Sequence, residues 1–134
     1  MLSYLRILKL KRVALFLTIV LALLIAVSTL TPLPTKIDVP GSDKWHHFVA
    51  FAVLVFPLAY CNKRYAIVIA IAALGYGGFI EIVQPYVNRY GEFNDFVADG
   101  IGVCIGIVYG HGFVFFWRFN ALTQKSGREL NRKA

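Results

Sequence analysis

Four long apolar stretches, separated by polar or proline-containing breaks, constrain this chain more than any other feature. They cover residues 13–30, 46–60, 65–84 and 96–117. A helix needs about 20 apolar residues to cross a bilayer, and strands of a membrane barrel would instead alternate apolar and polar residues. Only 16% of the 134 residues are charged, against roughly 25% in a soluble domain. The sequence therefore predicts an all-α integral membrane bundle of four transmembrane helices, with no room for a large soluble domain.

The expected organisation is a basic N-terminus (1–12), a membrane domain (13–117) and a basic tail (118–134). The second apolar stretch is the shortest, and Pro57 inside it is expected to kink its helix. The first stretch could also be the apolar region of a signal peptide, but it exceeds the usual 7–15 residues, so we expect an uncleaved helix. Cys104 falls in an apolar stretch and Cys61 directly follows one, which is not typical of a disulfide framework or a zinc knuckle.

Charge placement predicts the orientation of the helices. Eleven of the fourteen basic residues lie on one side of the predicted membrane: Arg6, Lys9, Lys11, Arg12, Lys63, Arg64, Arg118, Lys125, Arg128, Arg132 and Lys133. By the positive-inside rule, both termini and the loop after the second helix are cytoplasmic. Anionic lipid headgroups explain this basic surface, and no nucleic-acid-binding module is visible, so we expect the bilayer as partner and no nucleic acid.

Polar residues near the outer ends of the predicted helices are the candidate functional residues, because a charge inside a span is costly. Glu81 and Gln84 share a face of the third helix, Asp95 and Asp99 have i, i+4 spacing in the fourth, and Asp43 and His47 have the same spacing in the second. Arg89 lies in the short outer loop. Three helix ends and one loop thus place polar side chains at one membrane depth, and this convergence predicts an outward-facing site.

Each of these residues also has a structural interpretation. Asp43 and Asp95 suit helix N-caps, and His47 suits a packing role. Arg89 suits an interfacial charge or an ion pair with Glu81 or Asp99. No histidine pair has metal-ligand spacing, so the sequence predicts no metal and no cofactor, with a zinc or magnesium site of His47 and carboxylates as a minor alternative.

Small residues recur every four positions in the fourth stretch, at Ala98, Gly102, Gly106 and Gly110. Such ladders let membrane helices approach closely. Ala73 and Gly77 lead to Glu81 at the same spacing in the third stretch. If these two faces meet, Glu81 and Asp99 come close together.

Two motifs resemble those of the VanZ-like family. Residues 43–48, DKWHHF, resemble its D-K-x-x-H-F signature, and Glu81-x-x-Gln84-Pro85 with the later polar and glycine positions resembles its second signature. Carried over by position, the resemblance singles out Asp43, Lys44, His47, Glu81, Gln84, Arg89, Asp95 and Asp99. The family pattern most often has Asn where this chain has Asp99. The founding member is associated with low-level teicoplanin resistance, which implies a cell-envelope role in a bacterial inner membrane.

Three functions compete at this point. The first is binding or modifying an envelope component, such as a lipid-linked precursor or a glycopeptide. The second is an intramembrane enzyme in which Glu81, Asp99 or Asp95 acts with His47 as acid and base. The third is a small ion-coupled transporter that uses Glu81 and assembles as a homo-oligomer. The residues leave open whether the chain is an enzyme.

Overall fold

Four α-helices account for most of the part of the chain that the structure, a computed structural model, describes: residues 2–31, 42–89 and 91–133. They are α1 (Leu2–Leu30), α2 (Ser42–Cys61), α3 (Ala66–Val83) and α4 (Phe93–Lys133), with short 3₁₀ helices η1 (Lys63–Tyr65) and η2 (Gln84–Val87). The four α-helices carry candidate membrane spans: Leu5–Leu30, Lys44–Cys61, Lys63–Val87 and Phe93–Phe116. The predicted all-α architecture with four transmembrane helices is confirmed.

Two helices extend beyond the predicted apolar stretches. α1 begins at Leu2, eleven residues before the first stretch, and α4 continues to Lys133. Neither extension contains proline, and both are rich in leucine, lysine and arginine, which have high helix propensity. The helical pattern therefore continues where the apolar pattern stops. α2 runs through Pro57 without ending there.

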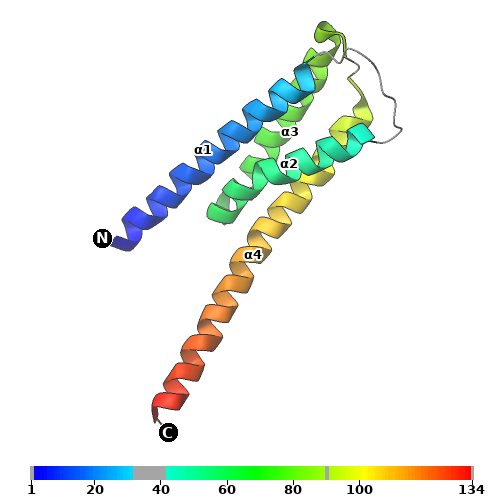
Figure 1. Cartoon of the computed structure of the whole chain (residues 1–134). Helices are drawn as coiled ribbons and strands as arrows, with labels where there is room; N and C mark the ends of the chain where they lie inside the picture. The colour runs from blue at the N-terminus through cyan, green and yellow to red at the C-terminus, as the bar shows by residue number, and fades with distance from the viewer. Residues whose placement is uncertain (1, 32–41, 90, 134) are drawn as a thin grey trace.

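The end of α1, the start of α2 and the connection from α3 to α4 lie at one end of the bundle (Figure 1). α3 ends at Val83 and passes into η2, where Pro85 occupies one of the first two positions. Asn88 then adopts a left-handed conformation, with φ of 57°, which asparagine tolerates better than most residues. The chain turns at this point and enters α4 beside the start of α2.

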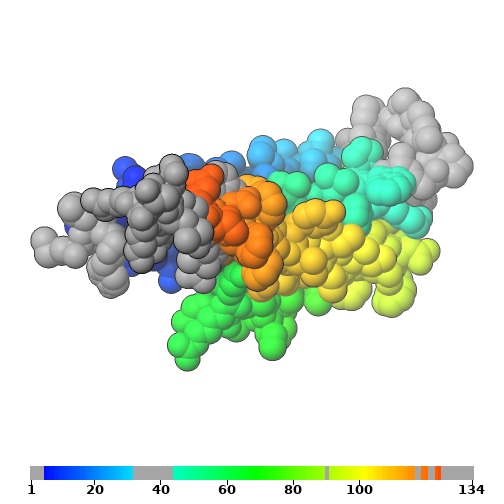
Figure 2. Space-filling view, turned by 90° about the horizontal axis from the view of Figure 1, so that it is seen from below, coloured from blue at the N-terminus to red at the C-terminus, as the bar shows by residue number. Residues whose placement is uncertain are grey.

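α2 is the central helix. It packs most extensively against α4 and also contacts α1 and α3. In the view of Figure 2, side chains of α4 lie between those of α2 and α3. The buried core is built mainly from α2 and α3, with additions from α1 and α4: Phe51, Leu54, Val55, Ile69, Ala73, Ile80, Ile25 and Val103. Large apolar side chains elsewhere on α1, α3 and α4 face outward, as expected for helices solvated by lipid.

The glycine ladder of α4 packs against α2. A Cβ at Gly102 would meet the backbone of Phe48 and Ala52, and one at Gly106 would meet Ala52 and the side chain of Val55. The α3 face considered from the sequence is therefore not the partner of these glycines. Close packing of α2 on α4 instead sets the spacing between the polar residues that these two helices carry.

Candidate functional site

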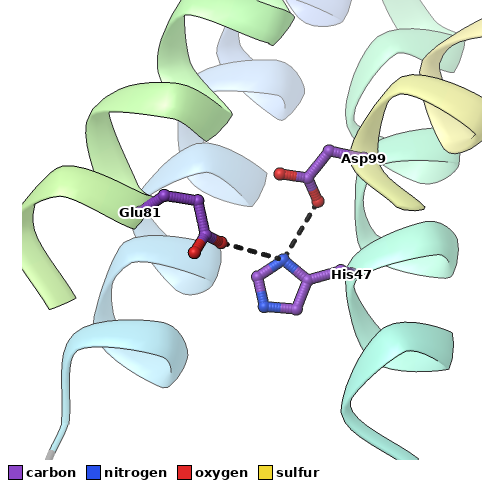
Figure 3. Close-up of side chains that lie close together, drawn as sticks. All are labelled: His47, Glu81 and Asp99. Atoms are coloured by element: carbon purple, nitrogen blue, oxygen red, sulfur yellow. Dashed lines mark hydrogen bonds and ion pairs between the residues drawn. The ribbon is translucent and has the colours of Figure 1, made fainter. Parts of the chain in front are cut away.

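His47 is the centre of a polar cluster formed by three helices (Figure 3). Its Nδ1 lies 3.0 Å from Oδ1 of Asp99, which is hydrogen-bond distance. The same nitrogen lies 3.9 Å from Oε1 of Glu81, close enough for electrostatic attraction but too long for a hydrogen bond. α2 thus supplies the imidazole, and α3 and α4 each supply a carboxylate on one side of the ring.

A third carboxylate faces the other nitrogen of the ring. Oδ2 of Asp95 lies 4.0 Å from Nε2 of His47. Asp95 and Asp99 are separated by four residues, so they share one face of α4 and flank the imidazole. Asp95 lies in the first turn of α4, where the helix dipole also stabilises a negative charge.

The cluster is almost closed to the exterior of the bundle. The side chains of His47, Asp95 and Asp99 are 3%, 3% and 1% exposed, and that of Glu81 is 12% exposed. Oδ2 of Asp99 and Oε1 of Glu81 are buried without a hydrogen-bond partner among the described residues. An unsatisfied buried carboxylate oxygen lowers the stability of the folded protein. Helix packing alone therefore does not explain why these carboxylates are buried here.

Gly77 of α3 makes room for Asp99. A Cβ at this position would lie 2.5 Å from Oδ2 of Asp99 and 3.1 Å from Cζ of Phe51. Phe51 is fully buried and lies one helical turn below His47 on α2. An apolar ring thus borders the cluster toward the bundle interior, and the absence of a side chain at Gly77 lets the carboxylate lie against α3.

The loop before α4 covers Glu81. The backbone N–H of Glu92 donates to Oε2 of Glu81 at 2.9 Å, and Gly91 comes so close to the Glu81 carbonyl that a Cβ would not fit there. The side chain of Glu92 extends outward to Nζ of Lys44, 3.4 Å away. The sequence predicts Gly77 as part of a packing face of the third helix, but it gives no role to Gly91, because the need for glycine there arises from a contact with Glu81.

The remaining predicted site residues lie around the cluster. Lys44, near the start of α2, forms an ion pair with Glu92 in the loop before α4. Gln84 is buried at the end of α3, and its Oε1 has no hydrogen-bond partner among the described residues. Nη1 of Arg89 donates to the carbonyls of Ser28, at 3.0 Å, and Thr31, at 3.4 Å. Arg89 therefore binds the C-terminal end of α1, while His47 provides the ion-pair contacts of Glu81 and Asp99. Asp43 is the second residue of α2, and its side chain lies outside the described residues.

This arrangement supports two kinds of chemistry, and the residues beside it suit contact with the membrane interface. A histidine held by an aspartate can accept and transfer protons. One imidazole nitrogen and several carboxylate oxygens can bind a divalent cation. The exposed aromatic side chains of Trp45, Tyr86 and Phe93 at the same end are of the type that lies at membrane interfaces.

The fold and the apolar helices define a multi-pass membrane protein with a buried polar cluster near one end of its bundle. Residues 13–117 match the model of the VanZ/LLP1 family, which covers most of the chain. The protein therefore belongs to the VanZ/LLP1 family, as the two sequence motifs predict. Comparison with curated proteins and with solved structures gives no match.

Proposed function

We propose that this VanZ-like protein binds or modifies a cell-envelope component at an outward-facing site centred on His47, Glu81 and Asp99. The single observation that carries the proposal is the convergence of these three side chains, from three helices, in a bundle whose described buried residues are mostly apolar. A charged group at the centre of a span costs roughly 2.5–3.5 kcal/mol on insertion scales, and a buried charge nearer the membrane surface is also costly unless it is paired. Replacing buried ion pairs by apolar residues is often neutral or stabilising, so folding alone does not require this cluster.

The position of the cluster supports access from one membrane surface. His47 and Asp99 lie five and six residues after the starts of α2 and α4, or about 8–9 Å along each helix. The hydrocarbon core of a bilayer is about 30 Å thick, so its midplane is farther away. This depth favours a ligand that arrives from the surface over a transport site, which usually lies near the midplane. The positive-inside rule places that surface outside the cytoplasm.

The surroundings of the cluster suit an anionic, lipid-linked ligand. Lys44 is half-exposed and lies at the mouth of the cluster, where its ammonium group would attract phosphate. The exposed aromatic side chains of Trp45, Tyr86 and Phe93 would hold the rim at the headgroup level. Glu81 is the most exposed member of the cluster, so it would be the first of the three to contact a bound headgroup.

An intramembrane enzyme is the second candidate function, and the His47–Asp99 pair favours it. An aspartate that holds one ring nitrogen of histidine fixes the orientation and tautomer of the imidazole. Glu81 on the same side of the ring would then act as an additional proton acceptor. In this alternative, the envelope component is a substrate, and the reaction takes place at the outer ends of α2, α3 and α4.

Native mass spectrometry of the protein purified in mild detergent tests the proposal. We expect a discrete lipid-linked ligand to co-purify with the wild type and with His111→Gln, but not with Glu81→Gln. His111 is a suitable control because it lies twelve residues beyond Asp99 on α4, about 18 Å away along the helix. Equal ligand occupancy in Glu81→Gln and the wild type would contradict the proposal.

A further inference from the structure

The species that fits between the three side chains of the cluster is small. His47 and Asp99 are almost fully buried, and Glu81 is 12% exposed. One ligand atom from each residue can be chosen so that all of these atoms lie within 4.8 Å of one another. The buried part of the cluster therefore suits a single ion, while a larger headgroup would contact the cluster from the side of Glu81, its most exposed member.

We propose that His47, Glu81 and Asp99 bind a divalent transition-metal ion, of the zinc or manganese class. The inference deepens the proposed function, because it names a component of the same site. It rests on side-chain geometry rather than on sequence spacing, which shows no histidine pair. The three ligands come from α2, α3 and α4, so only the assembled bundle brings them together.

The distances suit such an ion. Zinc binds histidine nitrogen and carboxylate oxygen at about 2.0–2.2 Å, so two ligand atoms of a tetrahedral ion are separated by roughly 3.4 Å. Nδ1 of His47 lies 3.0 Å from Asp99 Oδ1 and 3.9 Å from Glu81 Oε1. These two separations lie on either side of the required value, and all three ligand atoms lie within 4.8 Å of one another, so rotations of the two carboxylates would complete the coordination. Three protein ligands leave one position open, as in catalytic zinc sites.

The unpartnered oxygen atoms point to the same ligand. Oδ2 of Asp99 and Oε1 of Glu81 are buried without a hydrogen-bond partner among the described residues, and Figure 3 shows both carboxylates directed toward His47 on the Nδ1 side of its ring. A cation bound beside Nδ1 would neutralise both carboxylates at once, with Oδ1 of Asp99 and Oε1 of Glu81 as the nearest oxygen atoms. Binding would require Nδ1 to release its proton, which leaves the ring proton on Nε2.

Asp95 would then hold the histidine in its binding orientation. Its Oδ2 lies 4.0 Å from Nε2 of His47, the nitrogen that keeps the proton when Nδ1 binds metal. Metal-binding histidines almost always donate their other ring N–H to a carboxylate, a carbonyl or water, and loss of that partner typically costs 10–100-fold in metal affinity. Asp95 is therefore a positioning residue in this site.

Metal content measured separately from function tests the inference. The purified protein is stripped with EDTA, titrated with ZnCl2 or MnCl2 in detergent and desalted, and metal per chain is determined by elemental mass spectrometry. The three histidines of the chain supply matched variants: we expect one equivalent in the wild type, His46→Gln and His111→Gln, and at least tenfold weaker binding in His47→Gln. Asp99→Asn should weaken binding similarly while preserving the side-chain shape, which keeps the test valid if His47→Gln does not fold.

Two results would overturn the metal site. One is the absence of a stoichiometric zinc or manganese ion in the wild type, and the other is equal affinity in the wild type and Asp99→Asn. The metal measurement does not depend on the co-purified ligand. A metal-free wild type whose envelope ligand is lost in Glu81→Gln would therefore overturn this inference and leave the proposed function intact.

Discussion

Replacement of Gly102 by alanine should separate α2 from α4 one turn below the His47–Asp99 pair. A Cβ at Gly102 would lie 3.1 Å from the backbone nitrogen of Ala52 and closer still to the carbonyl oxygen of Phe48. Both atoms belong to the backbone of α2, so no side-chain rotation relieves the contact. The helix must shift as a unit, and overpacking of this kind typically costs 1–3 kcal/mol.

The matched control is Gly112→Ala on the same helix, because a Cβ at Gly112 has no neighbour within 4 Å. Alanine has a helix propensity about 0.8–1 kcal/mol better than that of glycine, and this gain applies to both variants. We therefore expect Gly112→Ala to be up to about 1 kcal/mol more stable than the wild type. Gly102→Ala should be less stable than Gly112→Ala by roughly 1–3 kcal/mol, the overpacking cost alone.

The assay is unfolding of both variants by a denaturing detergent in mixed micelles, followed by circular dichroism. Equal stabilisation of Gly102→Ala and Gly112→Ala would refute the argument that α2 and α4 are in backbone contact at this level. The same experiment tests the assignment of the glycine ladder to α2, because a ladder that faced lipid would tolerate the added methyl groups.

Three further changes test other contacts. Gly77→Ala should displace the Asp99 carboxylate and weaken ligand or metal binding at least tenfold. Its loss of stability should be smaller than that of Gly102→Ala, because the added methyl group meets a side chain and not a backbone. Unchanged binding would contradict the placement of Asp99 against α3. Arg89→Ala should lower the free energy of unfolding by about 1 kcal/mol through lost hydrogen bonds to the end of α1, read from detergent unfolding, and an unchanged stability would refute that contact. A double-mutant cycle of Lys44→Ala and Glu92→Ala should give a coupling energy below about 1 kcal/mol, because the pair is exposed, and the coupling should fall as salt is raised; a larger, salt-independent value would contradict it.

The lengths of the four apolar stretches predict the four helices, because insertion in lipid depends on the composition along each segment. It does not predict where α1 and α4 end, since the basic extensions of both helices are helical without being apolar. Hydropathy identifies the part of each helix that lies in the bilayer. Residues of high helix propensity then extend α1 and α4 beyond that part.

Spacing along each helix correctly places His47, Glu81 and Asp99 at a similar depth, but it does not determine which atoms meet. The contact of Nδ1 with Asp99 depends on how closely α2 approaches α4, and that distance is set by glycines whose partner helix the sequence leaves open. The Lys44–Glu92 pair and the bonds of Arg89 to α1 join residues 48 and about 60 positions apart. Pairings of this kind depend on the tertiary arrangement, so no local pattern reveals them.

The most direct test of the functional site compares an envelope phenotype with stability in the same variants. Cells from which the gene has been deleted are complemented with the wild type, Glu81→Gln or His111→Gln, and teicoplanin susceptibility, membrane abundance and thermal unfolding are measured for each. We predict that Glu81→Gln is as abundant and as stable as the wild type but loses the phenotype, while His111→Gln retains it. A Glu81→Gln variant that keeps the full phenotype, or that loses it only in proportion to its abundance, would contradict a functional role for the cluster.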